Sequence, residues 1–304
     1  DLETVLGYTS GTVTVGSITE DKTDLASVAL NSGTFAKASL TGAAITVTGQ
    51  INKGDAVTID AYHGGSGTVT VQSVTGSVTD MTDLDGDGTI SIGGAAIALT
   101  GDINFANADK VDNYTTGDTT VTSVSDSIAN VKKIHGLADV KMGAADVTIS
   151  DSITNKTQLD DTLTFTTGTV TVQTVSEDKT DLAALANAGG AYGRVKLAGA
   201  AITVTGNINK GEAETIDAYH GGTGTTTVQT VTGSASDMAT LAGGGNKISI
   251  AGADITLNSA ITNKSDLETV LGYTSGTVTV GSITEDKTDL ASVALNSGTF
   301  AKAS

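Results

Sequence analysis

The last 39 residues of this chain repeat the first 39 without a single difference. Residues 266–304 match residues 1–39 at an offset of 265. A self-contained domain rarely ends by restating its own beginning, so this identity indicates a window on a periodic chain: one 265-residue period plus an overlap. The first expectation for the fold is therefore an array of repeated units.

A finer repeat lies within this period. Residues 10–84 match residues 167–241 without a gap at an offset of 157. Below that, a glycine ahead of a Val/Ile-Thr-Val segment recurs every 23 to 31 residues. It divides the period into ten modules, which begin at Gly11, Gly42, Gly67, Gly94, Gly117, Gly143, Gly168, Gly199, Gly224 and Gly252. Gly-Thr modules alternate with Gly-Ala modules, and the third pair of modules diverges from the others.

Most modules contain two apolar residues that flank one polar residue, as Val13 and Val15 flank Thr14, followed three or four positions later by a third apolar residue. This period of two predicts a strand with one buried face. A single module of this size has to stack on its neighbours to bury that face. We therefore predict a mainly β fold: a parallel β-solenoid of about ten coils per period, with residues 1–304 as one continuous window. A tandem array of β-sandwich domains is the alternative.

In the second half of most modules the spacing of apolar residues changes from two to three. Residues 24–28 and 181–185 place apolar residues three apart, with a Thr ahead of the acid. This pattern suits a helix N-cap and first turn, so we expect short helical turns on one side of the solenoid. Residues 56–60 would fit a strand equally well. Asparagines recur at the module corners, where we expect them to determine the fold rather than bind ligands: Asn52, Asn104, Asn155, Asn209 and Asn263.

The amino-acid composition favours continuous strand ladders and argues against several classes of site and partner. The 304 residues contain no proline, where average usage gives roughly fifteen, and its absence suits continuous strand ladders because proline removes a donor. Without cysteine, disulfides and thiolate zinc sites are excluded. A net charge of −18 argues against nucleic acid as a partner.

No apolar run approaches the ~18 residues of a membrane helix. The segment starts and stops within a module, so we expect the native termini and any targeting signal to lie outside it.

The polar residue between the two apolar ones is Thr in nine of the ten modules. Stacking would turn this repetition into a column of threonines, and a doubled Thr column on a flat face can bind ice. A second column is not present in the sequence. The simpler interpretation is that Thr is favoured on the solvated face of a strand.

One acidic segment resembles the front of an EF-hand loop. Asp83, Asp85 and Asp87 alternate, and Gly88 follows. The twelfth position, where a bidentate Glu is expected, is Gly94, and the equivalent residues 240–246 hold no acid. We interpret the segment as a hydrophilic turn, with weak calcium binding by the three aspartates as the alternative. No other cofactor is expected.

Catalytic residues are not apparent. His63 and His220 occupy the same Tyr-His-Gly-Gly turn in two copies, which we interpret as surface structure. The adjacent acids at residues 20–21 and 177–178 fit solvated corners next to a lysine. A catalytic site would need further pocket residues around one of these groups. We therefore expect no enzyme activity.

The string Thr166-Thr167-Gly168-Thr169-Val170-Thr171-Val172, followed by Val175 and residues 181–185, resembles Thr/Val/Ala-rich tandem repeats of giant secreted and cell-surface proteins of cyanobacteria and other aquatic bacteria. The resemblance covers essentially the whole chain. It implies a role in a surface layer, adhesion, motility or an extracellular fibre, often with type I secretion. The glycine-rich nonapeptide calcium repeats that often accompany such proteins are not found here.

Together these observations predict a structural protein: a β-solenoid segment of a bacterial extracellular filament, fibre or surface layer. Its expected partners are other copies of itself, either covalent tandem repeats or subunits stacked end to end, because an uncapped strand edge invites another strand. A solenoid that binds a surface glycan, ice or calcium as an adhesin is the alternative.

Overall fold

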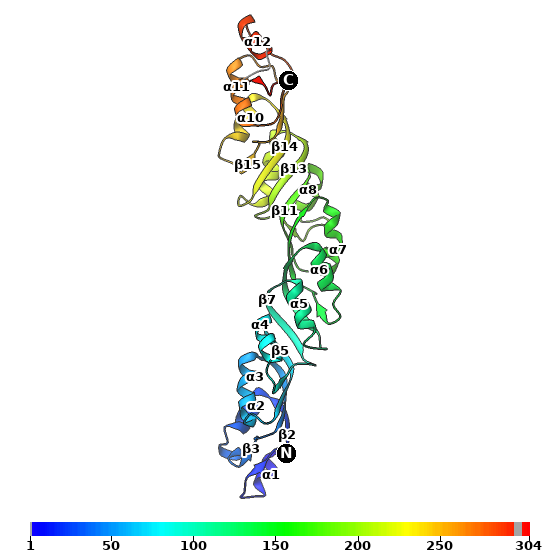
Figure 1. The fold of residues 1–304 in the computed structure, drawn as a ribbon, viewed down its shortest axis with the longest axis vertical. Helices are drawn as coiled ribbons and strands as arrows, with labels where there is room; N and C mark the ends of the chain where they lie inside the picture. Colours follow the sequence, from blue (N-terminus) through cyan, green and yellow to red (C-terminus); the bar gives the residue numbers. More distant parts are fainter. Residues whose placement is uncertain (1, 295–299) are drawn as a thin grey trace. The chain divides into compact units, whose positions relative to one another are not determined.

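The computed structural model describes residues 2–294 and 300–304, and the chain divides into two compact units, residues 1–146 and 147–304. Both units have an α/β architecture in which parallel strands alternate with short helices (Figure 1). Inside each unit the strands of the sheet are hydrogen-bonded in the order in which they occur along the chain.

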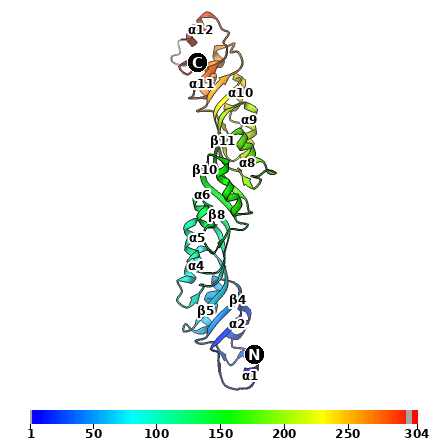
Figure 2. The ribbon, with the colours of Figure 1, turned by 90° about the vertical axis from the view of Figure 1, so that its right-hand side faces the viewer.

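The first unit contains a parallel sheet of five main strands and two short ones. The main strands are β2 (Ser17–Asp21), β4 (Ala44–Asn52), β5 (Thr68–Gly76), β7 (Ala96–Ile103) and β8 (Thr119–Asp126); β6 (Ile90–Ser91) and β9 (Val140–Lys141) pair beside β5 and β8, and β1 (Val13–Thr14) pairs with β3 (Ala38–Ser39). The helices are α1 (Leu2–Gly7), α2 (Lys22–Ala29), α3 (Lys53–Asp60), α4 (Val78–Asp85), α5 (Phe105–Asp112) and α6 (Ile128–His135), with 3-10 turns η1 (Gly33–Phe35) and η2 (Ala61–His63). Figure 2 shows β4 and β5 side by side, as their hydrogen bonding requires.

The second unit repeats this plan. Its strands are β10 (Asp146–Ile153), β11 (Val170–Asp178), β12 (Val195–Lys196), β13 (Ala201–Ile208), β14 (Thr225–Gly233), β15 (Ile248–Ser249), β16 (Asp254–Leu257) and β17 (Val278–Val280). Its helices are α7 (Asp160–Phe165), α8 (Lys179–Ala186), α9 (Lys210–Asp217), α10 (Ala235–Ala242), α11 (Lys264–Tyr273) and α12 (Lys287–Ala294), with η3 (Lys156–Leu159) and η4 (Ala218–His220). β12 and β15 are short strands that pair beside β11 and β14.

The expectation of a mainly β fold is wrong. What was expected to be isolated helical turns is, in most modules, a regular helix of eight residues, and residues 56–60, which could have been a strand, lie in α3. The reason is the combination of apolar residues three apart with a good N-cap, which favours a helix over a third strand. The pairing is parallel throughout, which does not match the antiparallel sheets of β-sandwich domains.

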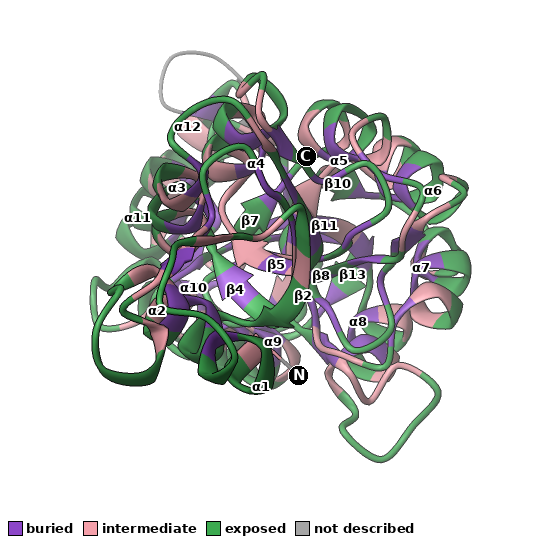
Figure 3. Cartoon of the chain, turned by 90° about the horizontal axis from the view of Figure 1, so that it is seen from below, coloured by how far each residue is buried: buried purple, intermediate pink, exposed green. Residues whose placement is uncertain are grey.

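The core of each unit lies between the strands and the helices. In β4 the inward residues Ile45, Val47 and Ile51 are buried, whereas Thr46 and Thr48 between them are half-buried. Figure 3 shows this change between buried and more exposed residues along β4. α3 packs on β4 and β5 and adds Ala56 and Ile59 to the core. Because successive strands are neighbours, right-handed connections place all helices of a unit on one face of its sheet. Threonine recurs on the outward face, as at Thr46, Thr70 and Thr120.

A β-bulge explains why the third apolar residue follows at three positions in one module type and at four in the other. β4 pairs with β5 in register from Ile45↔Val69, but the register shifts between Val47 and Gln50. The extra residue is accommodated at Gly49, whose φ of 74° lies in the left-handed region that glycine adopts without strain. Gly101 and Gly206 occupy the same place in β7 and β13.

Two kinds of junction alternate along each sheet. A Gly-Ala strand pairs in register with the Gly-Thr strand that follows it, so that Ile51 faces Val74. The next junction is displaced by six residues, because Val74 faces Ile97 instead of the equivalent corner residue Ile103. The front half of the Gly-Thr strand pairs instead with the short strand β6. The sheet therefore advances in steps of two modules.

This displacement breaks up the expected threonine column. Thr46 faces Thr70 on one side and Thr19 on the other, and the ladder ends at Ser91. The equivalent ladder in the next pair of modules runs from Thr75 through Ala98 and Thr120 to Lys141. The threonine hydroxyl groups therefore form short ladders. A flat ice-binding face would need one continuous column of them.

The corner asparagines act at helix N-termini. The Asn52 side chain accepts a hydrogen bond from the Asp55 N–H, and the Asp55 carboxylate accepts one from the Asn52 N–H, which together form a capping box. Asn155 and Asn209 are N-caps that also form capping boxes, and Asn104 and Asn263 are N-caps whose side chains accept a backbone N–H. Their role in the fold is as expected, but the backbone is extended at all five residues and not left-handed. Among the described residues, no helix is both long and apolar enough to cross a bilayer.

Candidate functional site

The feature that recurs along both units is the contact between one module and the next. Its closest point is a glycine against an alanine carbonyl. A Cβ atom added to Gly67 would lie 2.1 Å from the Ala43 oxygen. The same approach recurs at Gly117, Gly224 and Gly276 against Ala95, Ala200 and Ala253. Only glycine permits the backbone of one module to lie this close to the previous one, which gives these four marker glycines a physical role.

A cation from the following module caps the C-terminus of a helix. The Lys37 ammonium donates to the backbone carbonyls of Leu6, at 2.6 Å, and of Thr9. Arg194 donates to the carbonyls of Leu163 and Thr166, and Lys302 to those of Leu271, at 2.7 Å, and Thr274. The last carbonyls of a helix have no N–H donor within the helix itself, and a positive charge at this end also complements the helix dipole.

A second set of cations joins the N-termini of successive helices. The Lys179 ammonium lies 2.6 Å from the Glu212 carboxylate, and Lys22 lies 3.0 Å from Asp55. Lys156 with Asp181 and Lys264 with Asp289 form the equivalent pairs, whereas Lys53 at the start of α3 pairs with Asp83 near the C-terminal end of α4. These pairs are solvent-accessible, so each contributes a few tenths of a kcal/mol, or about 1 kcal/mol at most. They fix the register between helices more than they add stability.

Acids at strand ends cap the preceding helix. The Asp126 carboxylate accepts the Phe105 N–H at 2.8 Å, and Glu285 accepts the Lys264 N–H. Glu177 interacts with the Lys156 N–H in the same way and is only 7% exposed. The prediction that residues 177–178 form a solvated corner is therefore wrong for Glu177, because the adjoining module covers it. This burial, followed by the charge of Asp181, raises the pKa of Glu177, and its Oε1 has no hydrogen-bond partner.

The two equivalent histidines are buried and not on the surface as the sequence indicated. His63 and His220 are both fully inaccessible to solvent. Nε2 of His63 lies 2.9 Å from Asp60, and its Nδ1 accepts the Gly67 N–H at 3.1 Å. Since Nδ1 is an acceptor, this arrangement requires the proton on Nε2. The histidine fastens the turn ahead of the close Gly67 contact, where Thr115 performs the same task for Gly117.

The aspartates of the calcium hypothesis do not form a loop of alternating ligands. Asp83 and Asp85 lie in α4, where Asp83 pairs with Lys53. Asp87 accepts hydrogen bonds from the Thr89 N–H at 3.0 Å and the Thr89 hydroxyl at 2.7 Å, which lower its pKa. Within the part of the chain that the structure describes, no three or more His, Cys, Asp or Glu side chains group in a way that could hold a metal ion.

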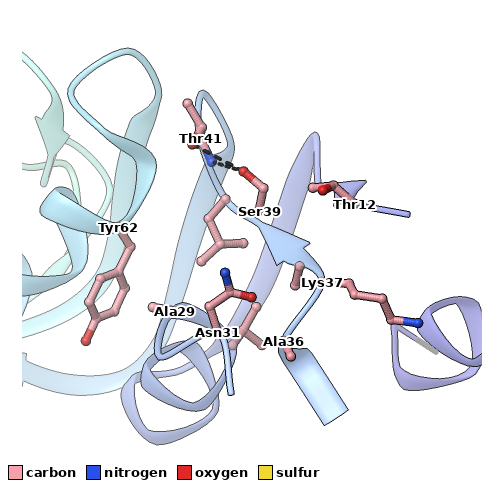
Figure 4. A pocket seen from close by; sticks show the side chains of 11 residues that line it. Thr12, Ala29, Asn31, Ala36, Lys37, Ser39, Thr41 and Tyr62 are labelled. Atoms are coloured by element: carbon pink, nitrogen blue, oxygen red, sulfur yellow. Dashed lines mark hydrogen bonds between the residues drawn. The ribbon is translucent and has the colours of Figure 1, made fainter. Parts of the chain in front are cut away.

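A pocket of about 350 Å³ lies beside β3 in the first unit. Its ionisable lining residues are Lys37 and Tyr62. Figure 4 shows the Lys37 side chain extending away from Asn31 and Tyr62, in keeping with its bonds to the Leu6 and Thr9 carbonyls, while Ser39 bonds with Thr41. The lining is otherwise made of methyl, hydroxyl and amide groups, which do not amount to an acid–base or nucleophilic site.

Sequence patterns identified the marker glycines and the corner asparagines, but they did not predict that the asparagines are helix N-caps or that side chains make contacts across modules. Lys37 and Leu6 are 31 residues apart, and Lys179 and Glu212 are 33 apart. The available signal was repetition: a cation recurs at residues 37, 194 and 302, which are related by the repeat offsets of 157 and 265.

No protein-family model, curated protein or solved structure matches the chain. Its function has to be inferred from its own residues.

Proposed function

We propose that this chain is a repeat segment of an extracellular filament, fibre or surface layer, built by stacking β-solenoid modules, and that its task is to provide length and stiffness. The observation that carries the proposal is the pairing adopted by the two identical 39-residue segments. Val13 faces Ala38 in the first copy, and Val278 faces Ala303 in the second. A chain that returns to the same sequence and the same pairing can continue with the next period in the same way.

The chemistry of the modules supports an array. The recurrent cations and strand-end acids described above, such as the Lys37 cap, the Lys179–Glu212 pair and the Asp126 cap, join one module to its neighbour. In repeat proteins of this kind stability is the sum of such nearest-neighbour contacts. Adding modules then adds length without requiring a new core. The groups are used for structure, which supports a role other than that of an enzyme.

The proposed extracellular location rests on the composition of the chain and on its resemblance to repeats of bacterial surface proteins. A net charge of −18 keeps long arrays soluble by mutual repulsion. The similarity to Thr/Val/Ala-rich repeats of giant bacterial surface proteins favours the cell surface or the extracellular space. Partners are then other copies of the same repeat, and the uninterrupted identity of residues 1–39 and 266–304 favours covalent continuation.

The proposal is tested with chains that carry one, two, three and four 265-residue periods. Electron microscopy should show rods whose contour length grows by roughly 48 Å per period, because ten strands about 4.8 Å apart are added each time. Immunogold labelling of the producing cells should place these rods outside the membrane. Compact particles whose dimensions do not scale with the number of periods would contradict the proposal.

A further inference from the structure

A groove between two successive helices recurs in both units. In the second unit it lies between α8 and α9 and has a volume of about 310 Å³; in the first unit the equivalent groove lies between α2 and α3 and has a volume of about 270 Å³. The residues that recur in it are, in the second unit, Lys179, Glu212, Thr215, Ile216 and Tyr219, and their equivalents at an offset of 157 line the groove of the first unit. Modules precede and follow the groove in the second unit, so it is a feature of the repeat and not of a chain end.

The tyrosine of each groove belongs to a series of aromatic residues. Ten positions after each corner asparagine stands an aromatic side chain: Tyr62, Tyr114, Phe165, Tyr219 and Tyr273. Between α4 and α5 this aromatic residue bridges the two helices, because the Tyr114 hydroxyl donates to the Thr82 hydroxyl at 3.3 Å. Thr82 is the fifth residue of α4, and the fifth residues of α2 and α8 are Ala26 and Ala183.

An alanine at this helix position leaves the groove open, because its methyl group cannot accept the hydrogen bond that Thr82 accepts. Among the described residues, the hydroxyl groups of Tyr62 and Tyr219 have no hydrogen-bond partner. Figure 4 shows the Tyr62 side chain with its hydroxyl directed away from the other labelled side chains. Each of the two grooves therefore offers a phenol group and one side of a tyrosine to a ligand.

The rim of the groove is polar but has no net charge. The Lys179 ammonium lies 2.6 Å from the Glu212 carboxylate, which also accepts the Asn209 N–H at 2.9 Å. The ammonium has two further N–H donors, and the carboxylate has further lone-pair sites. Because the pair is neutral as a whole, the rim favours an uncharged ligand with hydroxyl groups over an anionic polymer or a cation.

The apolar part of the groove is small. Ile216 lines it and is 2% exposed, and the half-buried Tyr219 lies beside it. A bound peptide helix would need several apolar anchors at regular spacing, and this groove offers one aliphatic side chain. A pyranose ring fits better: its C–H face packs on the tyrosine and isoleucine, and the hydroxyl groups around its edge bond to the ammonium, carboxylate and phenol groups.

We propose that the two grooves are binding sites for the sugar units of a neutral polysaccharide, so that the array holds polysaccharide chains on its helical side. This goes beyond the proposed function, since providing length and stiffness requires no ligand. Each 265-residue period carries both grooves. A chain of several periods should therefore bind a polysaccharide more tightly than a chain of one period, through multivalency.

The test uses the full 304-residue chain and isothermal titration calorimetry. The probes are cellohexaose, chitohexaose and mannohexaose as neutral oligosaccharides, and an alginate hexasaccharide as the anionic one. Ala26→Thr combined with Ala183→Thr places the residue of α4 in α2 and α8, where it should accept the tyrosine hydroxyl and close both grooves. Ala239→Thr makes the same change at the fifth residue of α10, which lines neither groove, and is the control.

The wild-type chain and Ala239→Thr should bind at least one of the neutral oligosaccharides and not the alginate. The double threonine variant should bind that oligosaccharide at least about tenfold more weakly, with an unchanged circular dichroism spectrum. A second comparison separates binding from folding. Tyr62→Phe with Tyr219→Phe keeps both rings and should lose less affinity than Tyr62→Ala with Tyr219→Ala, which should lose about tenfold or more.

Three results would overturn the proposal. The first is that no neutral oligosaccharide binds, and the second is that the wild-type chain and the double threonine variant bind equally. The third is self-association in analytical ultracentrifugation that the double threonine variant loses, since the groove would then be a contact between copies of the chain. Rods that lengthen with each added covalent period would still support the proposed function after any of these results.

Discussion

The Ala43 carbonyl oxygen lies where the β-carbon of Gly67 would be if Gly67 were any other residue: the two positions are 2.1 Å apart. This contact joins consecutive modules, and a methyl group there would force the strands apart. Gly11 begins the same Gly-Thr-Val-Thr-Val sequence, yet its added Cβ meets only the Thr9 hydroxyl, at an ordinary 3.6 Å.

Gly67→Ala should therefore destabilise the first unit by about 2 kcal/mol or more, as a forced backbone shift in a packed interface does. Gly11→Ala, in the same sequence context, should change the free energy of unfolding by less than about 0.5 kcal/mol. Urea denaturation followed by circular dichroism provides both values. Equal effects of the two substitutions would show that the close approach is unimportant.

His63→Ala should remove about 2–3 kcal/mol of stability, because it leaves a cavity and strips Asp60 and the Gly67 N–H of their buried partner. His135 is exposed at the end of α6, so His135→Ala should cost less than about 0.5 kcal/mol. Thermal unfolding of the two variants is the comparison. A small effect at residue 63 would return the histidine to the surface role that the sequence suggested.

Thr226 occupies an inward position between valines and isoleucines, is fully buried, and its hydroxyl has no hydrogen-bond partner. Thr226→Val keeps the shape and removes the unpaired hydroxyl, so it should stabilise the second unit by about 1 kcal/mol. Thr227→Val, on the exposed outward side of the same strand, should change stability little. Destabilisation by Thr226→Val would mean that the hydroxyl is satisfied in solution.

The raised pKa of Glu177 makes the stability of the second unit depend on pH. The folded chain holds this proton more tightly than the unfolded chain, so the stabilisation is full below the ordinary value of 4.5 and is lost as the pH rises through the raised folded value. Glu177→Gln should therefore raise stability at neutral pH, by about 1 kcal/mol, and flatten the pH profile. The equivalent Glu20 is exposed, and Glu20→Gln should leave both unchanged.

The sequence predicted the parts of the fold that depend on local pattern. The alternation at Val69 and Val71 predicts a strand, which is confirmed. Asn52 is predicted to fix a corner of its module, but not to start a helix, and the structure shows it as the N-cap of α3. The sequence did not predict the displaced junction at which Val74 faces Ile97. At that junction the front half of β5 pairs with the short strand β6, and a strand of two residues is too short to show a period in the sequence.

The recurring contacts were harder to predict for a related reason. Glu20 and Glu177 are each followed by Asp-Lys in the sequence, yet Glu20 is exposed and Glu177 is buried beside the helix-start residue Lys156. His63 is buried because the following glycine approaches the previous module. Burial of this kind is set by residues about one module away, so sequence patterns within one module could not reveal it.

Electron cryomicroscopy of a chain carrying several 265-residue periods tests the central claim most directly. If modules stack through the contacts described here, the maps should show one uninterrupted series of parallel strands about 4.8 Å apart, with residues 266–304 continuing into the next period as residues 1–39 continue into β4. Separate compact particles joined by linkers, or sheets with antiparallel strands, would contradict it.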